Sequence, residues 1–96
     1  MGALRSLGNV QQQLGELDKS QKSLQHSLEI AQRLQVPEEI SLTKFSLGNT
    51  TRLNGDINNA ITHYQNAANS APYTYLLTYL FDFTSFQIKW QFKIKL

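Results

Sequence analysis

His26 and Glu29 are the residues whose types and spacing come closest to a chemical site. They lie three positions apart, so on a helix they share one face, where an imidazole and a carboxylate could hold a metal ion or pass a proton. A metal site needs three or four converging ligands, and this spacing supplies only two. A solvated pair on a helix surface is therefore the favoured interpretation.

The sequence offers no stronger starting point for catalysis. The chain has no cysteine that could act as a nucleophile, bind zinc as a thiolate or form a disulfide. It also has no glycine-rich loop of the kind that cradles phosphate groups. We therefore expect a protein that is not an enzyme, with no cofactor and no catalytic or metal site.

Charge is distributed unevenly along the chain. Residues 1–72 carry six basic and six acidic side chains, and the positive excess comes from Lys89, Lys93 and Lys95. A neutral region offers no basic stripe for phosphates, so no nucleic acid partner is expected. The most hydrophobic stretch, residues 73–86, is interrupted by an aspartate and is too short to span a bilayer. A membrane role is therefore disfavoured, and a cytoplasmic location is expected.

The sequence repeats itself at a fixed shift of 40 residues. The clearest anchor is the tripeptide Leu-Gly-Asn, which occurs at residues 7–9 and again at 47–49. The match continues without insertion or deletion, as expected for an internal repeat. The identical pairs are Ser6 with Ser46, Gly15 with Gly55, Gln25 with Gln65 and Ala31 with Ala71, and the similar pairs are Glu16 with Asp56, Leu17 with Ile57 and Leu24 with Tyr64.

Each copy has the hydrophobic period of two helices, because apolar residues recur every three or four positions. Gly15 and Gly55 fit left-handed residues that end the first helix of each copy, and Asp56 or Asn58 can cap the helix that follows. Pro37 suits the first turn of a new helix. We expect helices over residues 3–14, 17–35, 38–53 and 57–70, with apolar stripes at Leu4, Leu7, Val10 and Leu14 in the first and at Ile57, Ala60, Ile61, Tyr64, Ala67 and Ala68 in the fourth.

These features resemble the tetratricopeptide repeat (TPR) family, in which small residues at fixed places let two helices pack closely. The family pattern has leucine, glycine, alanine, an aromatic residue, alanine and proline in order. The second copy has Leu47, Gly48, Ala60, Tyr64, Ala67 and Pro72 at these places, and the first has Leu7, Gly8, Ser20, Leu24, Ser27 and Gln32. Serine is nearly as small as alanine, and its hydroxyl can bond a carbonyl one turn earlier, so we expect close packing to survive.

The resemblance implies an all-α fold over residues 1–72, in which two helix-turn-helix hairpins at about 3–36 and 38–72 form a short α-solenoid. The 40-residue period exceeds the family standard of about 34. It resembles the long variety found in kinesin light chains and in bacterial, especially cyanobacterial, signalling proteins. The competing interpretation is a generic four-helix bundle with an accidental repeat, which predicts no matching glycines.

A solenoid of this family implies a concave face, lined by the first helix of each hairpin, that binds a peptide or protein partner. An asparagine amide both donates and accepts hydrogen bonds, so Asn9 and Asn49 could hold the backbone of an extended peptide. The competing interpretation is that both amides only bond an adjacent helix. The predicted groove residues are Arg5, Asn9 and Gln12 in the first copy and Phe45, Asn49 and Arg52 in the second.

Arg5, Asn9 and Asn49 also resemble part of the carboxylate clamp with which some TPR proteins hold a peptide C-terminus. Such clamps take further basic residues from a third repeat, which is not recognisable here, so generic peptide binding is the main hypothesis. At least three repeats are normally needed for stability, so we expect the chain to be a fragment of a larger repeat protein. The exposed end of the repeat pair could also allow self-association.

Residues 73–96 do not continue the repeat. They hold eight of the ten aromatic residues and no glycine, and from residue 86 onward apolar and polar side chains alternate as in a strand. A capping helix, a hairpin around residues 82–85 and a disordered tail without a selected fold are the three possibilities. The alternative function is a membrane-surface adaptor whose aromatic, lysine-rich tail rests among lipid headgroups.

Overall fold

The computed structural model describes residues 2–70, which form four helices joined by short turns. Their bounds are Gly2–Gln13 for α1, Leu17–Leu34 for α2, Pro37–Leu53 for α3 and Ile57–Ser70 for α4. Each bound lies within one residue of its expected position, so the all-α prediction is confirmed. The predictions for residues 73–96, including the membrane-surface hypothesis, lie outside the described residues, and so does Pro72 of the repeat pattern.

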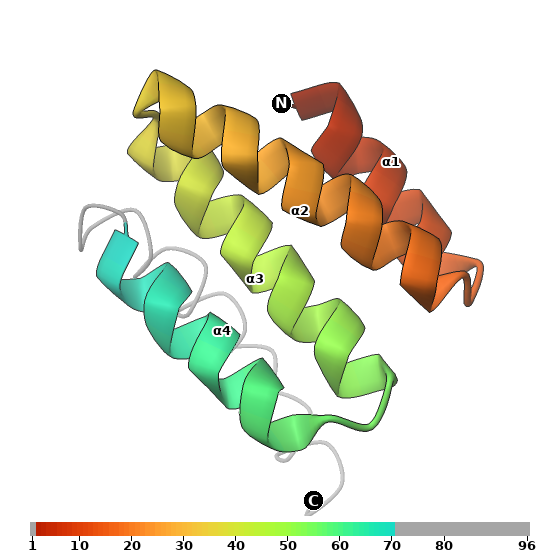
Figure 1. The fold of residues 1–96 in the computed structure, drawn as a ribbon. Helices are drawn as coiled ribbons and strands as arrows, with labels where there is room; N and C mark the ends of the chain where they lie inside the picture. The colour runs from red at the N-terminus through yellow and green to blue at the C-terminus, as the bar shows by residue number, and fades with distance from the viewer. Residues whose placement is uncertain (1, 71–96) are drawn as a thin grey trace, which may run out of the picture.

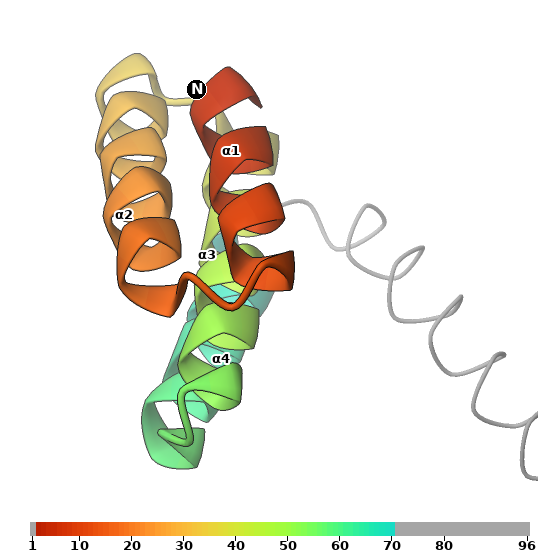
Figure 2. The ribbon, with the colours of Figure 1, turned by 90° about the vertical axis from the view of Figure 1, so that its right-hand side faces the viewer.

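The helices form two stacked antiparallel hairpins (Figure 1). Helix α1 packs on α2, α2 on α3 and α3 on α4, and α1 also contacts α3. Figure 2 shows α2 on one side of the molecule, with α1 and α3 on the other side. The first helix of the second hairpin therefore lies against both helices of the first hairpin, as in a short α-solenoid.

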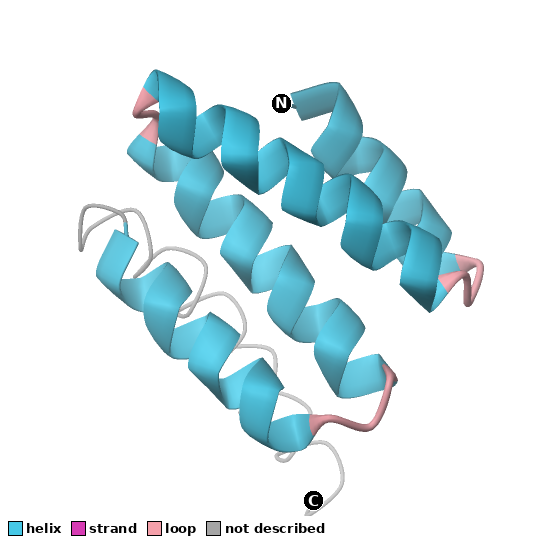
Figure 3. Cartoon of the chain, viewed as in Figure 1, coloured by secondary structure: helices cyan, strands magenta, loops and turns pink. Residues whose placement is uncertain are grey.

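Glycine ends the first helix of each hairpin in the same way. Gly15 and Gly55 have φ angles of +80° and +88°, which only glycine adopts without strain. Gly15 N–H donates to Gln12 O and Glu16 N–H to Gln11 O (3.1 and 2.9 Å), and the same two bonds recur 40 residues later. This is the hydrogen-bond pattern of a Schellman motif. The predicted left-handed stops are confirmed, and they place the two tight turns in Figure 3.

The second helices of the two hairpins begin differently. Asp56 caps α4, because its carboxylate accepts a hydrogen bond from Asn59 N–H (3.4 Å). Glu16 occupies the equivalent position before α2 but makes no capping bond from its side chain. Pro37 starts α3 in its first turn, as predicted. Of the two residues considered for the cap of α4, the structure selects Asp56.

Two glycines allow the helices of each hairpin to approach closely. A Cβ atom added at Gly8 would lie 2.6 Å from Leu24 Cγ, and one added at Gly48 would lie 2.6 Å from Tyr64 Cε1. Leu24 and Tyr64 are themselves equivalent under the 40-residue shift. The two glycines thus have equivalent surroundings, which an accidental repeat in a generic bundle would not produce.

The core joins the two hairpins and contains many small polar side chains. Leu24, Leu28 and Leu47 form its apolar centre, with Ile40 packed against it. Ser20 is fully buried, and its hydroxyl donates to Gly8 O on α1 (2.8 Å). The expectation that this hydroxyl would bond a carbonyl one turn earlier in its own helix is therefore wrong. Because Gly8 has no side chain, the α1 backbone comes within reach of the Ser20 hydroxyl.

Part of the predicted apolar stripes is uncovered within residues 2–70. Leu7 and Val10 on α1 are 48% and 52% exposed, Leu14 directly after α1 is 69% exposed, and Ile57 and Ile61 on α4 are also exposed. In the second hairpin the position equivalent to Leu7 is covered by the core leucines of α2. Helix α1 lacks this cover because the described residues contain no helix that precedes α1 in the chain and packs on it as α2 packs on α3.

Candidate functional site

The predicted groove residues of the first repeat lie where α1 faces α3. Arg5, Asn9 and Gln12 are spaced by four and three residues, so they share one face of α1. The Arg5 guanidinium pairs with the Glu39 carboxylate of α3 through Nε to Oε2 (3.1 Å) and Nη2 to Oε1 (3.4 Å). Both side chains are about one quarter exposed. This two-bond pair fixes the N-terminal part of α1 against α3.

Gln12 makes a second bridge between α1 and α3. Its Nε2 donates to Thr50 Oγ1 (2.9 Å) and Ser46 O (3.3 Å). Thr50 Oγ1 also shares a buried hydrogen bond with Ser20 Oγ of α2 (2.9 Å). These contacts connect α1, α2 and α3 through one buried network. The Gln12 amide nitrogen is thus already occupied in joining the two repeats.

The predicted groove residues of the second repeat converge on Tyr64. The Phe45 ring lies 5.4 Å from the Tyr64 ring, centroid to centroid, in a tilted arrangement. The Tyr64 hydroxyl donates to Asn49 Oδ1 (2.6 Å), and Arg52 Nε donates to the Tyr64 oxygen (3.3 Å). We call these four residues the Tyr64 cluster. Within it Phe45 is 42% exposed and Arg52 is exposed, so the cluster presents an aromatic ring and a guanidinium to solvent.

Tyr64 is the member of this site that sequence reasoning missed. It was assigned to the apolar stripe of the fourth helix as the aromatic residue of the repeat pattern. The available signal was its difference from Leu24, which holds the equivalent position without a hydroxyl. A tyrosine hydroxyl seeks a hydrogen-bond partner when its ring is partly buried. Here it finds two polar residues on α3.

Asn9 differs from its equivalent in the second repeat. Asn49 accepts the Tyr64 hydroxyl, so the structural interpretation of the asparagine holds there. Asn9 is half-buried, and its side-chain amide makes no hydrogen bond to any residue in the range 2–70. Leu24 occupies the position equivalent to Tyr64, and it has no hydroxyl that could donate a hydrogen bond to Asn9. Within residues 2–70 the donor and the acceptor of the Asn9 side-chain amide therefore both lack a hydrogen-bond partner.

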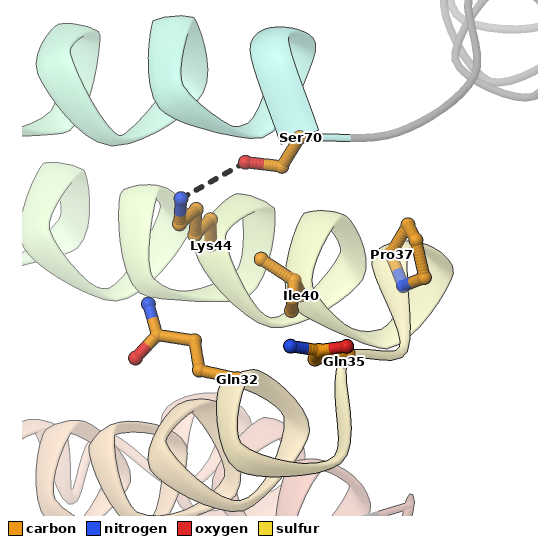
Figure 4. A pocket seen from close by; sticks show the side chains of 6 residues that line it. All are labelled: Gln32, Gln35, Pro37, Ile40, Lys44 and Ser70. Carbon is orange, nitrogen blue, oxygen red and sulfur yellow. Dashed lines mark hydrogen bonds between the residues drawn. The ribbon is translucent and has the colours of Figure 1, made fainter.

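A shallow pocket of about 320 Å³ lies apart from these residues. It is lined by the end of α2, the start of α3 and the last residue of α4, with Ile40 at its base and Lys44 at its side (Figure 4). Lys44 Nζ donates to Ser70 Oγ (2.9 Å) across the opening. None of the six predicted groove residues lines this pocket.

The repeated hairpin matches a known protein family. A tetratricopeptide repeat family model matches residues 1–72, the same range as the two hairpins and their matched glycines. The chain belongs to the tetratricopeptide repeat family. Searches of curated proteins and of solved structures gave no match.

Membership of the TPR family supports a general role in protein–protein interaction, since the family consists broadly of non-enzymatic scaffolds. His26 and Glu29 are both exposed on α2, and within residues 2–70 no three histidine, aspartate or glutamate side chains gather into a possible metal site. Of the helices the structure describes, none combines the length and apolarity needed to cross a membrane. The TPR surface described here offers hydrogen-bonding and cationic groups for recognition.

Proposed function

We propose that residues 1–72 are a TPR unit that holds an extended segment of a protein partner along the face shared by α1 and α3. The observation that carries the proposal is the half-buried Asn9 amide, which has no hydrogen-bond partner within residues 2–70. A half-buried amide gains most when a ligand supplies both a donor and an acceptor, as a peptide backbone does. Asn9 is therefore the proposed anchor for the partner's main chain.

The Tyr64 cluster supplies the side-chain contacts of the proposed site. Phe45 offers an exposed aromatic face that is held by its contact with Tyr64. Arg52 offers an exposed guanidinium positioned by the Tyr64 oxygen, and it suits an acidic residue of the partner. Because these side chains are already ordered in the free protein, binding loses little conformational entropy at the cluster. We propose that the partner segment is extended and carries an apolar and an acidic residue.

Arg5 and Gln12 frame the proposed site from the α1 side. Arg5 would have to release Glu39 before it could bind a terminal carboxylate, so the ion pair argues against a carboxylate clamp at this position. Gln12 is held by Thr50 and Ser46 in the same way. We assign Arg5 and Gln12 to positioning α1 against α3, and Asn9 to direct contact with the partner.

We also propose the repeat variety, the parent protein and the cellular compartment to which this unit belongs. The 40-residue spacing supports the long variety of the repeat, and the preference of such arrays for three or more repeats supports a larger parent protein. We place that parent in the cytoplasm, with residues 73–96 as a segment separate from the two repeats.

A selection with a displayed library of random peptides tests the proposed site. The full chain is immobilised, and a peptide recovered from the library is synthesised and its affinity is measured by fluorescence anisotropy. Asn9→Ala and Arg52→Ala are each expected to weaken binding about tenfold, the effect of losing roughly 1.4 kcal/mol of binding energy. Gln25→Ala, on the exposed surface of α2, is the matched control and should leave the affinity unchanged.

The same measurement can reject the proposal. If Asn9→Ala and Arg52→Ala bind the selected peptide as tightly as the unchanged chain does, the α1–α3 face is not the site. If Lys44→Ala alone weakens binding, the partner instead uses the pocket between α2, α3 and α4.

A further inference from the structure

The junction between the two hairpins consists of a face of α3 that is covered by side chains of α2. Helix α3 presents Leu47 and Thr50 to the first hairpin, where they are 1% and 2% exposed. Leu47 packs in the cluster of Leu24 and Leu28, and Thr50 shares a hydrogen bond with Ser20. One face of α3 is therefore covered by three residues of α2.

The same face recurs on α1 without its cover. Under the 40-residue shift, Leu7 corresponds to Leu47 and Val10 corresponds to Thr50. Leu7 and Val10 are 48% and 52% exposed, whereas their equivalents on α3 are buried. The α1 face, which we define as Leu7 and Val10, is thus the uncovered counterpart of a surface that this fold already covers elsewhere.

The covering surface recurs at the opposite end of the unit. The three residues of α2 that cover α3 are Ser20, Leu24 and Leu28, and their equivalents on α4 are Ala60, Tyr64 and Ala68. We call these three α4 residues the α4 face. Ala68 is exposed and Tyr64 is half-buried, whereas Ala60 is only 1% exposed and is therefore already covered within the chain. No helix within residues 2–70 lies on this face in the way that α3 lies on α2.

The two faces match each other in chemistry. At the internal junction, the buried hydroxyls of Ser20 and Thr50 form a hydrogen bond. At the two ends of the unit the equivalent residues are Val10, which is exposed, and Ala60, which is already buried within the chain. Neither side chain carries a polar group that a contact between the two faces would leave without a hydrogen-bond partner.

We propose that a second copy of this chain docks its α1 face on the α4 face of the first, repeating the internal junction between molecules. Leu7 of one copy then packs against Tyr64 and Ala68 of the other, with Val10 at the edge of the same contact. Such a contact joins two different surfaces, so it is heterologous and can add further copies in a row. This inference does not rest on peptide binding at Asn9, which lies on neither face, although Tyr64 belongs both to the α4 face and to the Tyr64 cluster.

Sedimentation velocity of the full chain over a range of concentrations tests the proposal. The expected result is a mass that rises with concentration from the 10.9 kDa of one chain past that of a dimer. Leu7→Lys and Ala68→Glu are each expected to weaken association about tenfold or more, because each buries a charge in an apolar contact. Leu7 is 48% exposed and Ala68 is exposed in one chain, so far-UV circular dichroism should be unchanged.

Mixing the two variants separates this arrangement from other forms of association. In a head-to-tail assembly, the lysine on the α1 face of the Leu7→Lys chain meets the glutamate on the α4 face of the Ala68→Glu chain, and the two charges attract. The unaltered α4 face of the first variant can also bind the unaltered α1 face of the second. An equimolar mixture should therefore associate again. Leu34→Lys, at a side chain that is 60% exposed and belongs to neither face, is the control that should associate normally.

Three results would overturn the proposal. One is a single mass of 10.9 kDa at every concentration, as expected if another part of the same chain covers one face. Another is that mixing the Leu7→Lys and Ala68→Glu chains fails to restore association, as expected if two α1 faces contact each other. The last is equal weakening by Leu34→Lys, which would indicate unspecific apolar association.

Discussion

The two TPR hairpins share one backbone plan but use their polar residues differently. In the first hairpin Arg5, Gln12 and Ser20 bond across to α3, so its polar residues attach the second hairpin. In the second hairpin Asn49 and Arg52 bond to Tyr64 within the same hairpin and remain near the surface. The difference indicates that the first repeat is specialised for stacking and the second for presenting a preformed cluster.

The residue that packs on the repeated glycine, Gly8 or Gly48, carries most of this difference. Leu24 is fully buried on Gly8 and contributes only apolar contact, whereas Tyr64 is half-buried on Gly48 and adds a hydroxyl. Leu24 therefore stabilises the core, and Tyr64 orders the surface. The same place in the repeat serves stability in one copy and orders a surface cluster in the other, and we propose that this cluster contacts the partner.

The largest expected effect comes from truncating the first of these two side chains. Leu24→Ala should lower the free energy of unfolding by about 2–5 kcal/mol, because it leaves a cavity in the core cluster. Leu34→Ala, at a side chain that is 60% exposed, should change it by less than about 0.5 kcal/mol. Urea unfolding followed by circular dichroism measures both. A small loss for Leu24→Ala would mean that the two hairpins are not joined through this cluster.

Alanine at the two glycines sharpens the comparison. Gly8→Ala forces a methyl group onto the fully buried Leu24, at a cost of about 1–3 kcal/mol, while alanine regains about 1 kcal/mol of helix propensity. We therefore expect a net loss of about 1 kcal/mol for Gly8→Ala. Gly48→Ala should cost less, because the half-buried Tyr64 ring can turn outward.

Gly2→Ala is the control for these two changes, because no atom lies within 4 Å of the added methyl group. It should leave stability unchanged or raise it slightly. Thermal unfolding of the three variants under one condition gives the ranking. A greater loss for Gly48→Ala than for Gly8→Ala would contradict the assignment of Leu24 to the core and of Tyr64 to the surface.

The smallest expected effect distinguishes the starts of the two second helices. Asp56→Ala removes the capping carboxylate of α4 and should cost about 0.5–1 kcal/mol in the free energy of unfolding. Glu16→Ala removes no capping bond, and its exposed ion pair with Lys19 contributes little, so stability should be nearly unchanged. Denaturant titrations of the two variants test the contrast, and equal losses would show that Glu16 also caps its helix.

Local signals made most of the fold predictable from the sequence. The apolar period and the matched glycines located all four described helices and both left-handed stops, because these features depend on residues close together in the chain. The exposure of Leu7 and Val10 was not predictable in this way, because periodicity identifies an apolar face but not what covers it.

The candidate site was predictable only in outline. The helical spacing placed Arg5, Asn9 and Gln12 on one face. The 40-residue shift identified the equivalent residues of the second repeat, which are Phe45, Asn49 and Arg52. The Arg5 pair with Glu39 joins residues 34 positions apart, so only the stacking of α1 on α3 brings the two together. The Asn49 bond to Tyr64 likewise depends on how α4 packs against α3, which spacing along one helix does not determine.

The most direct test of the central claim is a nuclear magnetic resonance titration of the isotope-labelled chain with a peptide selected for binding. We expect the Asn9 side-chain amide resonances to shift on binding and those of Gln12, already bonded to α3, to stay close to their free positions. Shifts confined to Gln32, Gln35 and Lys44 around the separate pocket, with Asn9 unchanged, would contradict the central claim.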